Sequence, residues 1–157
     1  MIVVADTTPL NYLVLIDEID LLQALYELVL IPDEVLREMQ RPKTPAAVQA
    51  WVSNLPAWCE VRSPASIPDA ALSALDAGER DAIQLALDSG IDMVLMDERE
   101  GREEAKRRHL KVTGTISLLE KAAQLGLVDF RAALQRLEQT NFRLSASLRE
   151  AFLGRNL

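Results

Sequence analysis

The chain of 157 residues has one cysteine, one histidine and no long apolar run. The lone cysteine, Cys59, excludes an internal disulfide bond and a zinc site built from several cysteines. No uninterrupted apolar stretch reaches the ~18 residues that a membrane-spanning helix needs. The first residues carry an acid, Asp6, and no basic start, unlike a secretory signal peptide. We therefore expect a protein that has no membrane partner and stays in the reducing cytoplasm.

The composition is that of a soluble globular protein rather than a disordered one, with 49% hydrophobic and 26% charged residues. The sequence shows no internal repeat, no low-complexity block and no linker rich in glycine and serine. At ~150 residues per domain, the length favours a single domain over residues 1–157.

The net charge of −7 argues against bulk binding of nucleic acid, because phosphates repel an acidic surface. However, the chain has 24 acidic and 17 basic residues. Four carboxylates gathered at one metal site would leave 20 acids against 17 bases elsewhere. The overall charge therefore does not exclude a nucleic-acid substrate.

Short apolar runs alternate with helical patterns along the chain. We expect strands at residues 2–5, 28–31, 58–62, 93–96 and 111–113. We expect helices at residues 9–16, 18–26, 33–40, 45–55, 69–76, 79–89, 102–110, 115–125, 129–139 and 145–152, with Gly78 separating two of them. Loops are expected at the proline-bearing stretches 41–45 and 63–68. This alternation predicts an α/β fold with three layers, α/β/α, and a mostly parallel central sheet.

Four acidic residues stand where such a fold can bring them together. Asp6 and Asp97 directly follow expected buried strands, and ligands bind beyond the carboxyl ends of parallel strands. Glu38 lies near the apolar face of its helix; taken alone, the alternative for it is a solvated surface residue. Asp81 lies in the first turns of another helix, where an acid also interacts favourably with the helix dipole.

If the four acids converge, their mutual repulsion raises their pKa values unless a cation occupies the site. Ligation by oxygen alone suits Mg²⁺ or Mn²⁺ rather than zinc. Such ions activate water and stabilise the leaving oxygen in phosphodiester hydrolysis. The spacing of the acids along the sequence does not by itself establish that they converge.

Four segments resemble PIN-domain proteins, the fold of the VapC-like toxin ribonucleases. In chain order they are VVADTTPLNYL, PDEVLREM, LDAGERDAIQLAL and VLMDEREGREEAKRRHLKVTGTISLL, which lie between residues 2 and 119. Residues 97–102 match the DERxGR-type signature of a small prokaryotic PIN subgroup. The resemblance implies a PIN-like fold and the activity of a metal-dependent endoribonuclease.

The resemblance also implies roles for individual residues. The four acids Asp6, Glu38, Asp81 and Asp97 would bind Mg²⁺ or Mn²⁺ and carry catalysis, and Thr7 would support Asp6. Metal-activated water would attack the RNA phosphate and leave a 5′-phosphate and a 3′-hydroxyl.

Several neighbours of these acids have alternative roles. Glu79 lies two residues before Asp81 and points away from it on a helix, so either can be the ligand; we take Asp81 as the prediction. Glu98 could share the role of Asp97. Thr113 and Thr115 belong to a turn whose hydroxyl groups either cap the next helix or approach the water at the metal.

Basic residues gather next to Asp97. The stretch 99–111 holds six basic and three acidic residues in an acidic protein. Arg99, Arg102 and Lys106 are therefore candidates for binding the RNA substrate. The alternative is an ordinary solvated cluster of ion pairs.

The predicted partner proteins depend mainly on the resemblance to the PIN-domain family. It implies the toxin of a type II toxin–antitoxin pair, with a cognate antitoxin protein, and it favours a homodimer. The leucine-rich stretch 10–26 could supply the dimer face. Residues 129–157 lie beyond the matching segments, and we expect them to form a C-terminal helical extension that packs on the domain or contacts a protein.

Two other functions compete with the nuclease. The pattern of a strand followed by Asp6 and Thr7 is similar to the motif of haloacid-dehalogenase-like phosphatases. However, Thr8 stands where those enzymes need a second aspartate. The other alternative is a catalytically silent PIN-fold module that binds nucleic acid or protein. The presence of all four acids argues against it.

Overall fold

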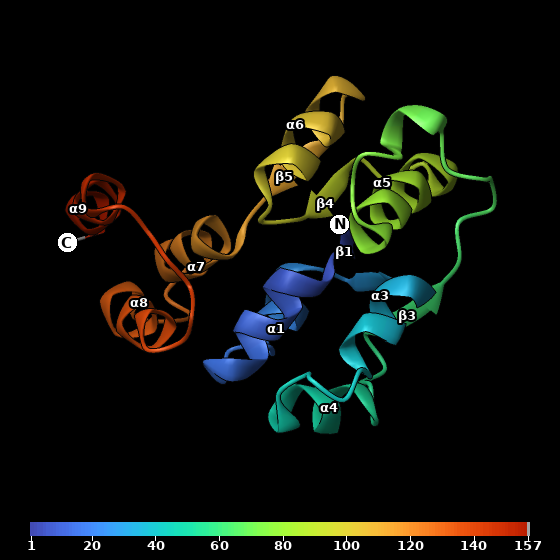
Figure 1. Cartoon of the computed structure of the whole chain (residues 1–157). Helices are drawn as coiled ribbons and strands as arrows, with labels where there is room; N and C mark the ends of the chain where they lie inside the picture. Colours follow the sequence, from blue (N-terminus) through green and yellow to red (C-terminus); the bar gives the residue numbers. More distant parts are fainter. Residues whose placement is uncertain (157) are drawn as a thin grey trace.

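A computed structural model of the chain describes residues 1–156 and contains one sheet of five strands (Figure 1). The strands are β1 (Ile2–Ala5), β2 (Leu28–Pro32), β3 (Cys59–Arg62), β4 (Met93–Leu95) and β5 (Lys111–Thr113). Their order across the sheet is β3-β2-β1-β4-β5, and every neighbouring pair is parallel. From β1 the chain thus adds β2 and β3 toward one edge of the sheet, and then crosses back to add β4 and β5 toward the other edge. The direction of winding reverses between β1 and β4.

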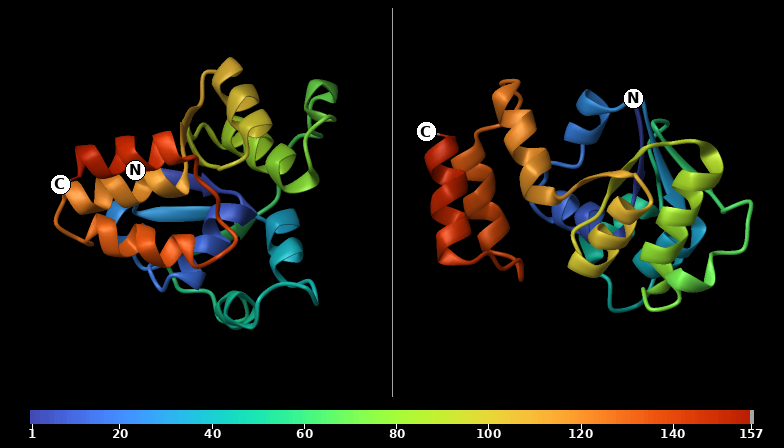
Figure 2. Two further views of the ribbon diagram at one scale, coloured as in Figure 1. Left: turned by 60° about the vertical axis from the view of Figure 1, so that its left-hand side comes forward. Right: turned by 90° about the horizontal axis from the view of Figure 1, so that it is seen from above.

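Helices and one short 3₁₀ turn connect the strands. They are α1 (Thr7–Leu15), α2 (Leu21–Leu25), α3 (Asp33–Met39), α4 (Ala46–Val52), the 3₁₀ turn Ala70–Leu72, α5 (Ala77–Ser89), α6 (Arg99–Arg107), α7 (Thr115–Gln124), α8 (Phe130–Glu138) and α9 (Ala146–Arg155). Among these described helices, none combines the length and hydrophobicity that crossing a membrane requires. In both views of Figure 2, α5 and α6 lie together, away from α7, α8 and α9.

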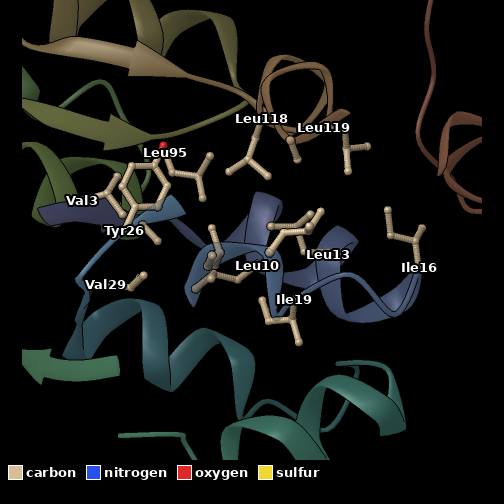
Figure 3. Close-up of a cluster of buried hydrophobic side chains, with 14 of the residues drawn as sticks. Val3, Leu10, Leu13, Ile16, Ile19, Tyr26, Val29, Leu95, Leu118 and Leu119 are labelled. Atoms are coloured by element: carbon tan, nitrogen blue, oxygen red, sulfur yellow. The ribbon is translucent and has the colours of Figure 1, made fainter. Parts of the chain in front are cut away.

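Each face of the sheet is covered by its own helices, because side chains alternate between the two faces of a strand. Val3 and Ala5 of β1 belong to the larger buried cluster, with residues of α1, α3, α4, α7 and α8. Figure 3 shows Leu10 and Leu13 of α1 in this cluster, close to Leu118 of α7. Val4, between Val3 and Ala5, packs instead with residues of α5 and α6. The predicted three-layer α/β/α fold is therefore confirmed, and the sheet is parallel throughout.

The C-terminal helices α8 and α9 pack beside α7 (Figures 1 and 2). Buried leucines of α8 join the larger cluster. Helix α9 has no fully buried residue, but its half-buried Phe152 and Leu153 pack on the core, Phe152 beside Phe130 of α8. Ion pairs from Arg149 to Glu138 at 2.8 Å and from Arg155 to Glu120 at 3.0 Å add to this contact.

The leucines of residues 10–26, which could have supplied a dimer face, mostly pack in the core of the single chain. Leu10, Leu13, Leu21 and Leu22 are buried in the core of this chain, and only Leu15 among the leucines of α1 and α2 is substantially exposed. The hydrophobic pattern of residues 10–26 is thus explained by folding of the single chain. A homodimer rests on the family resemblance alone.

Around Gly78, one predicted helix is wrong and the next begins two residues earlier than predicted. The helix expected at residues 69–76 is reduced to the 3₁₀ turn, in which Asp69 accepts a hydrogen bond from the Ala71 N–H at 2.9 Å. Helix α5 begins at Ala77 and includes Gly78 in its first turn. The reason is Asp76, whose side chain accepts the Glu79 N–H at 2.8 Å and caps the helix.

Other helix boundaries also differ from the prediction, including the end of α4 at Val52 instead of residue 55 and the end of α9 at Arg155 instead of residue 152. The helix expected at residues 18–26 shrinks to α2, because Asp17 turns the chain with a left-handed φ of 61°. Helix α6 starts at Arg99 instead of residue 102, with Glu98 as its N-cap residue. The five strands and the two proline-bearing loops lie where the sequence predicts them, within two residues.

Candidate active site

The reversal of winding between β1 and β4 creates a crevice at the carboxyl ends of these strands, which is where open parallel sheets bind ligands. Ala5 of β1 lies opposite Leu95 of β4, so the two strands end at the same level. Asp6 comes next after β1, and its N–H donates to the Leu95 carbonyl at 3.0 Å. Asp97 follows β4 by two residues. Both predicted strand-end acids therefore lie at the switch point.

Thr7 connects Asp6 with Glu38 of α3. The Thr7 hydroxyl donates to Glu38 Oε2 at 2.6 Å, and the Thr7 backbone N–H donates to the Asp6 carboxylate. The resemblance implied that Thr7 supports Asp6; its backbone does so here, while its side chain orients Glu38. One residue thus holds two of the candidate acids in place.

Gly78 leaves the space in which Asp6 and Glu38 meet. A Cβ at this position would lie 2.9 Å from Glu38 Oε1 and 3.1 Å from Asp6 Oδ1. Both distances are shorter than comfortable van der Waals contact. The two carboxylates therefore converge over the backbone of the first turn of α5, where glycine alone avoids a steric conflict.

We expect Gly78→Ala to lower cleavage activity ~10- to 100-fold, because displacements of about 1 Å in an active site have effects of this size. The added methyl group would push the Glu38 and Asp6 carboxylates apart while removing no charge. The measurement is the initial rate of RNA cleavage with Mg²⁺.

The matched control is Gly154→Ala in α9, where an added Cβ meets no atom within 4 Å. This variant should cleave like the wild type and be slightly more stable, since alanine favours a helix over glycine by roughly 1 kcal/mol. Equal activity of Gly78→Ala and Gly154→Ala would show that crowding at Gly78 is harmless.

Glu79 of α5 is buried and directed at α6. It is 5% exposed, and a Cβ at Gly101 of α6 would collide with Glu79 Oε2. This oxygen is buried and has no hydrogen-bond partner among the described residues. Burial, together with the charges of Asp76 and Asp6, holds the pKa of Glu79 well above its ordinary value. The structure thus places an acid whose Oε2 is unsatisfied among the described residues between α5 and α6, where the charge of Asp6 acts on its pKa.

Asp81 lies on another side of α5. The charged groups that act on its pKa are Arg80 and residues of α3, namely Glu34, Asp33 and Arg37. It borders shallow hollows formed with residues 63–70. The pKa of Asp6, by contrast, is raised by the charges of Asp76, Glu38 and Asp97. Of the two alternatives on α5, the geometry therefore favours Glu79 over the predicted Asp81.

Asp97 is fixed by the start of α7. The Thr115 N–H donates to Asp97 Oδ1 at 2.8 Å, and the Thr115 hydroxyl donates to Asp97 Oδ2 at 2.6 Å. Thr115 is fully buried. The N-cap residue of α7 is Gly114, so the Thr115 hydroxyl positions an acid rather than capping the helix. Thr113 is the last residue of β5.

The acids of the crevice are costly to ionise. The pKa of Asp6 is raised to about 7, chiefly by burial and then by the charges of Asp76, Glu38 and Asp97, which outweigh the Thr7 N–H. Burial also raises the pKa of Asp97, against the hydrogen bonds from Thr115 and the positive charge of Arg102. A bound cation would remove these penalties by stabilising the carboxylates.

The donors fit a hard divalent cation. All are carboxylate or hydroxyl oxygens, and the buried Glu79 Oε2 has no hydrogen-bond partner in the part of the chain that the structure describes. Among residues 1–156, no three His, Cys, Asp or Glu side chains gather closely enough to coordinate one ion together. Mg²⁺ suits this spacing, because it usually binds one or two carboxylates directly and keeps several of its waters.

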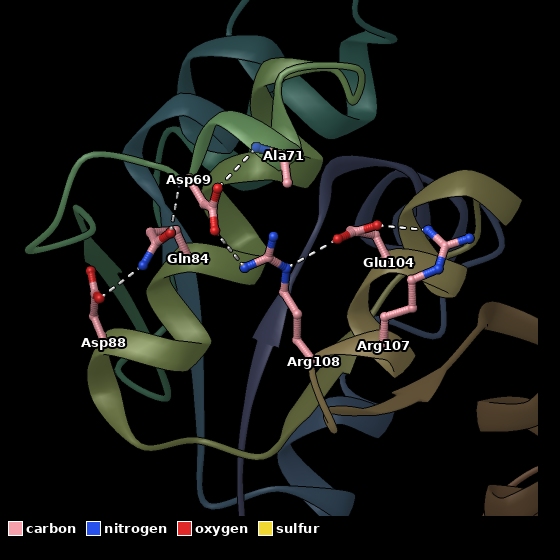
Figure 4. A network of polar contacts seen from close by, with 7 residues as sticks. All are labelled: Asp69, Ala71, Gln84, Asp88, Glu104, Arg107 and Arg108. Carbon is pink, nitrogen blue, oxygen red and sulfur yellow. Dashed lines mark hydrogen bonds and ion pairs between the residues drawn. The ribbon is translucent and has the colours of Figure 1, made fainter.

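Most of the basic residues near Asp97 are neutralised by ion pairs. Arg99 pairs with Glu103 at 3.0 Å on the surface. Figure 4 shows Glu104 between Arg107 and Arg108, at 2.7 and 3.2 Å, with Arg108 also reaching Asp69. These contacts match the alternative of an ordinary ion-pair cluster.

Arg102 differs from the other basic residues of α6. A Cβ at Gly114 would lie 2.5 Å from Arg102 Nη1 and 2.8 Å from Asp97 Oδ1, so the guanidinium faces that acid. Lys106 is exposed on α6, and Glu98 borders a cavity together with Asp97. Of the three predicted substrate contacts, Arg102 is thus the one that the structure brings to the crevice.

Asp76 is an acid near the site that the sequence analysis missed. Its charge acts on both Asp6 and Glu79, and its side chain caps α5. The pattern Asp76-x-x-Glu79 is similar to a capping box, in which a cap residue precedes a glutamate by three positions. That signal was present, but Gly78 was interpreted as a break between helices.

The fold and the site together define an α/β protein with an acidic crevice at the switch point of a parallel 3-2-1-4-5 sheet. A family model described as a PIN domain matches residues 2–156, so the chain belongs to the PIN-domain family. PIN domains are usually nucleases and generally bind divalent metal ions. No curated protein and no solved structure matches the chain. Membership in this family sets aside the phosphatase alternative.

Proposed function

We propose that the protein is a Mg²⁺- or Mn²⁺-dependent endoribonuclease. The observation that supports this most strongly is the meeting of the Asp6 and Glu38 carboxylates over Gly78 at the switch point of a PIN-domain sheet, with Glu79 and Asp97 on the neighbouring elements. Asp6 and Glu79 are buried carboxyl groups that a cation would stabilise, and Asp97 lines an open cavity. Both properties suit hydrolysis of a phosphodiester bond.

In this proposal some side chains bind the metal, and others orient the side chains that bind it. One or two of Asp6, Glu38, Glu79 and Asp97 would bind the ion directly and the others through its waters, and the ion would supply water activation and neutralisation of phosphate charge. Thr7 orients Glu38, and Thr115 orients Asp97 through two hydrogen bonds. Arg102 faces the same crevice and would bind a phosphate oxygen of the substrate.

The resemblance to toxin ribonucleases extends the proposal to the protein's biological setting. It supports a type II toxin that acts on RNA in the cytoplasm, as a homodimer controlled by a cognate antitoxin protein. Helices α8 and α9, within the predicted extension 129–157, would then be free to contribute to substrate or partner contacts.

The experiment that tests the activity uses purified protein and a panel of structured RNA, single-stranded RNA and single-stranded DNA of matched sequences. We expect cleavage of RNA with Mg²⁺ or Mn²⁺, no cleavage with EDTA, and 5′-phosphate ends on the products. Binding of RNA without cleavage under any metal would favour the silent binding module. Preferential cleavage of the DNA would contradict the ribonuclease.

A further inference from the structure

A cavity of about 410 Å³ opens beside Asp97. Its walls come from α1, the turn from β4 into α6, the start of α7, α9 and the segment between α8 and α9. The volume lies within the ~300–1,000 Å³ range of small-molecule sites in proteins. Because the cavity borders Asp97, a group bound in it would be adjacent to the candidate hydrolytic centre.

Residues 140–144, between α8 and α9, form a defined wall of this cavity. The Tyr12 hydroxyl of α1 donates to Asn141 Oδ1 at 2.8 Å. The rings of Tyr12 and Phe142 meet edge to face, with centroids 5.1 Å apart and an interplanar angle of 84°. The Phe142 N–H donates to Thr140 Oγ1 at 3.1 Å. The 140–144 segment is thus attached to the same helix that begins next to Asp6.

Arg143 supplies the wall with a positive charge that no carboxylate among residues 1–156 neutralises. It is exposed, and its Nη1 donates only to the carbonyls of Thr140 and Phe142, at 3.2 and 3.1 Å. Among residues 1–156, it has no carboxylate partner, whereas most arginines of the chain do. The paired ones are Arg37, Arg62, Arg99, Arg107, Arg108, Arg136, Arg149 and Arg155.

The lining of the cavity matches the chemistry of one nucleotide. Tyr12 and Phe142 offer aromatic surface, on which unpaired bases stack regardless of their sequence. Arg102 and Arg143 offer guanidinium groups, which bind phosphate oxygens through two parallel hydrogen bonds. Bases within a duplex are already stacked and cannot enter such a site, so the lining favours a single strand.

We propose that this cavity is a nucleotide subsite for single-stranded RNA, formed by the 140–144 segment together with Tyr12. Arg143 binds the backbone phosphate that flanks the scissile one, and Phe142 and Tyr12 contact the base. This inference rests on the proposed ribonuclease function and adds a role for the C-terminal part of the chain, which holds none of the candidate acids.

The test measures binding of a fluorescently labelled single-stranded RNA to the full chain in EDTA, where no cleavage is expected. Arg143→Ala should weaken binding about tenfold and lower the slope of log K against log[salt] by ~0.7, the value for one phosphate contact on a single strand. Arg143→Lys should recover part of the affinity. The control is Arg131→Ala, which removes an exposed arginine of α8 outside the cavity.

A second variant, Phe142→Leu, probes the base. It should weaken binding of normal RNA about five- to tenfold, in the range of a lost base–aromatic stack, and should leave binding of an abasic strand unchanged. Thermal unfolding of each variant identifies any loss of folding. With Mg²⁺, we expect a higher KM for Arg143→Ala and a kcat close to that of the wild type.

The outcomes separate the subsite from the activity. A wild type that binds and cleaves RNA, with Arg143→Ala and Arg131→Ala equal to it in affinity and salt slope, would overturn the subsite alone. A wild type that neither binds nor cleaves RNA would overturn both the subsite and the ribonuclease. Equal weakening of normal and abasic RNA by Phe142→Leu would contradict contact with the base.

Discussion

Asp6→Asn is expected to abolish metal-dependent RNA cleavage and at the same time to stabilise the metal-free protein at pH 8. Loss of activity follows because Asp6 is the acid at the centre of the crevice, near Glu38, Glu79 and Asp97. Even residues that only support metal ligands cost ~10- to 100-fold when changed, so the loss of a ligand should exceed this. The measurement is single-turnover cleavage with saturating Mg²⁺.

The gain in stability follows from the raised pKa of Asp6. In the unfolded chain this carboxyl ionises near pH 4, but in the folded protein its pKa is about 7. The folded state therefore holds a proton that the unfolded state has lost, and stability falls as the pH rises between these two values. Asparagine cannot ionise and avoids this loss. We expect an advantage for the variant on the order of 1–3 kcal/mol at pH 8, and none near pH 4.

Urea unfolding in EDTA at pH 4, 6 and 8 measures this difference. Addition of Mg²⁺ should then stabilise the wild type more than the variant, because a ligand stabilises the state that binds it. Asp20→Asn on the exposed surface before α2 is the control and should show neither effect. Equal stability of wild type and Asp6→Asn at pH 8 would contradict the burial cost assigned to Asp6, and retained cleavage would contradict its role.

Glu79→Gln should lower cleavage on the order of 100-fold or more, whereas Asp81→Asn should stay within about twofold of the wild type. The two variants form a matched pair, since each removes one negative charge from the first turns of α5 and changes the helix dipole interaction similarly. They differ in position: Glu79 is buried beside α6, and Asp81 lies against the charged residues of α3.

Calorimetric titration with Mg²⁺ gives a second measure that does not depend on the substrate. Glu79→Gln should bind the ion more weakly, and Asp81→Asn should bind it like the wild type. The reverse pattern would restore Asp81 as the ligand, as the sequence analysis predicted.

The fold and three of the acids could be predicted from local patterns. Buried β-branched and apolar runs located β1 and β4, and the acids that follow them were found for the same reason. Glu38 was found from its distance to Val35 along a helix that the sequence marks clearly. In each case the signal lies within about ten residues, which is the range over which periodicity carries information.

The choice between Glu79 and Asp81 could not be made in this way. Both fit the same helical period, and two residues correspond to ~200° around a helix axis, so the answer depends on how α5 is rotated against the sheet. Packing of Ala82, Ile83 and Leu85 sets that rotation. The wall of the cavity could not be predicted from the sequence either, because the hydrogen bond from Tyr12 to Asn141 joins positions 129 residues apart.

The same long-range contact has a consequence for the order in which the protein becomes complete during synthesis. All the candidate acids, the last strand and Thr115 are made before α7 is finished. At ~5–20 residues per second, the chain from Thr115 to Asn141 takes roughly 1–5 s to synthesise. The residues that form the acidic crevice are therefore made before Asn141 exists to bind Tyr12. The 140–144 wall beside the crevice is added after the sheet that holds the acids.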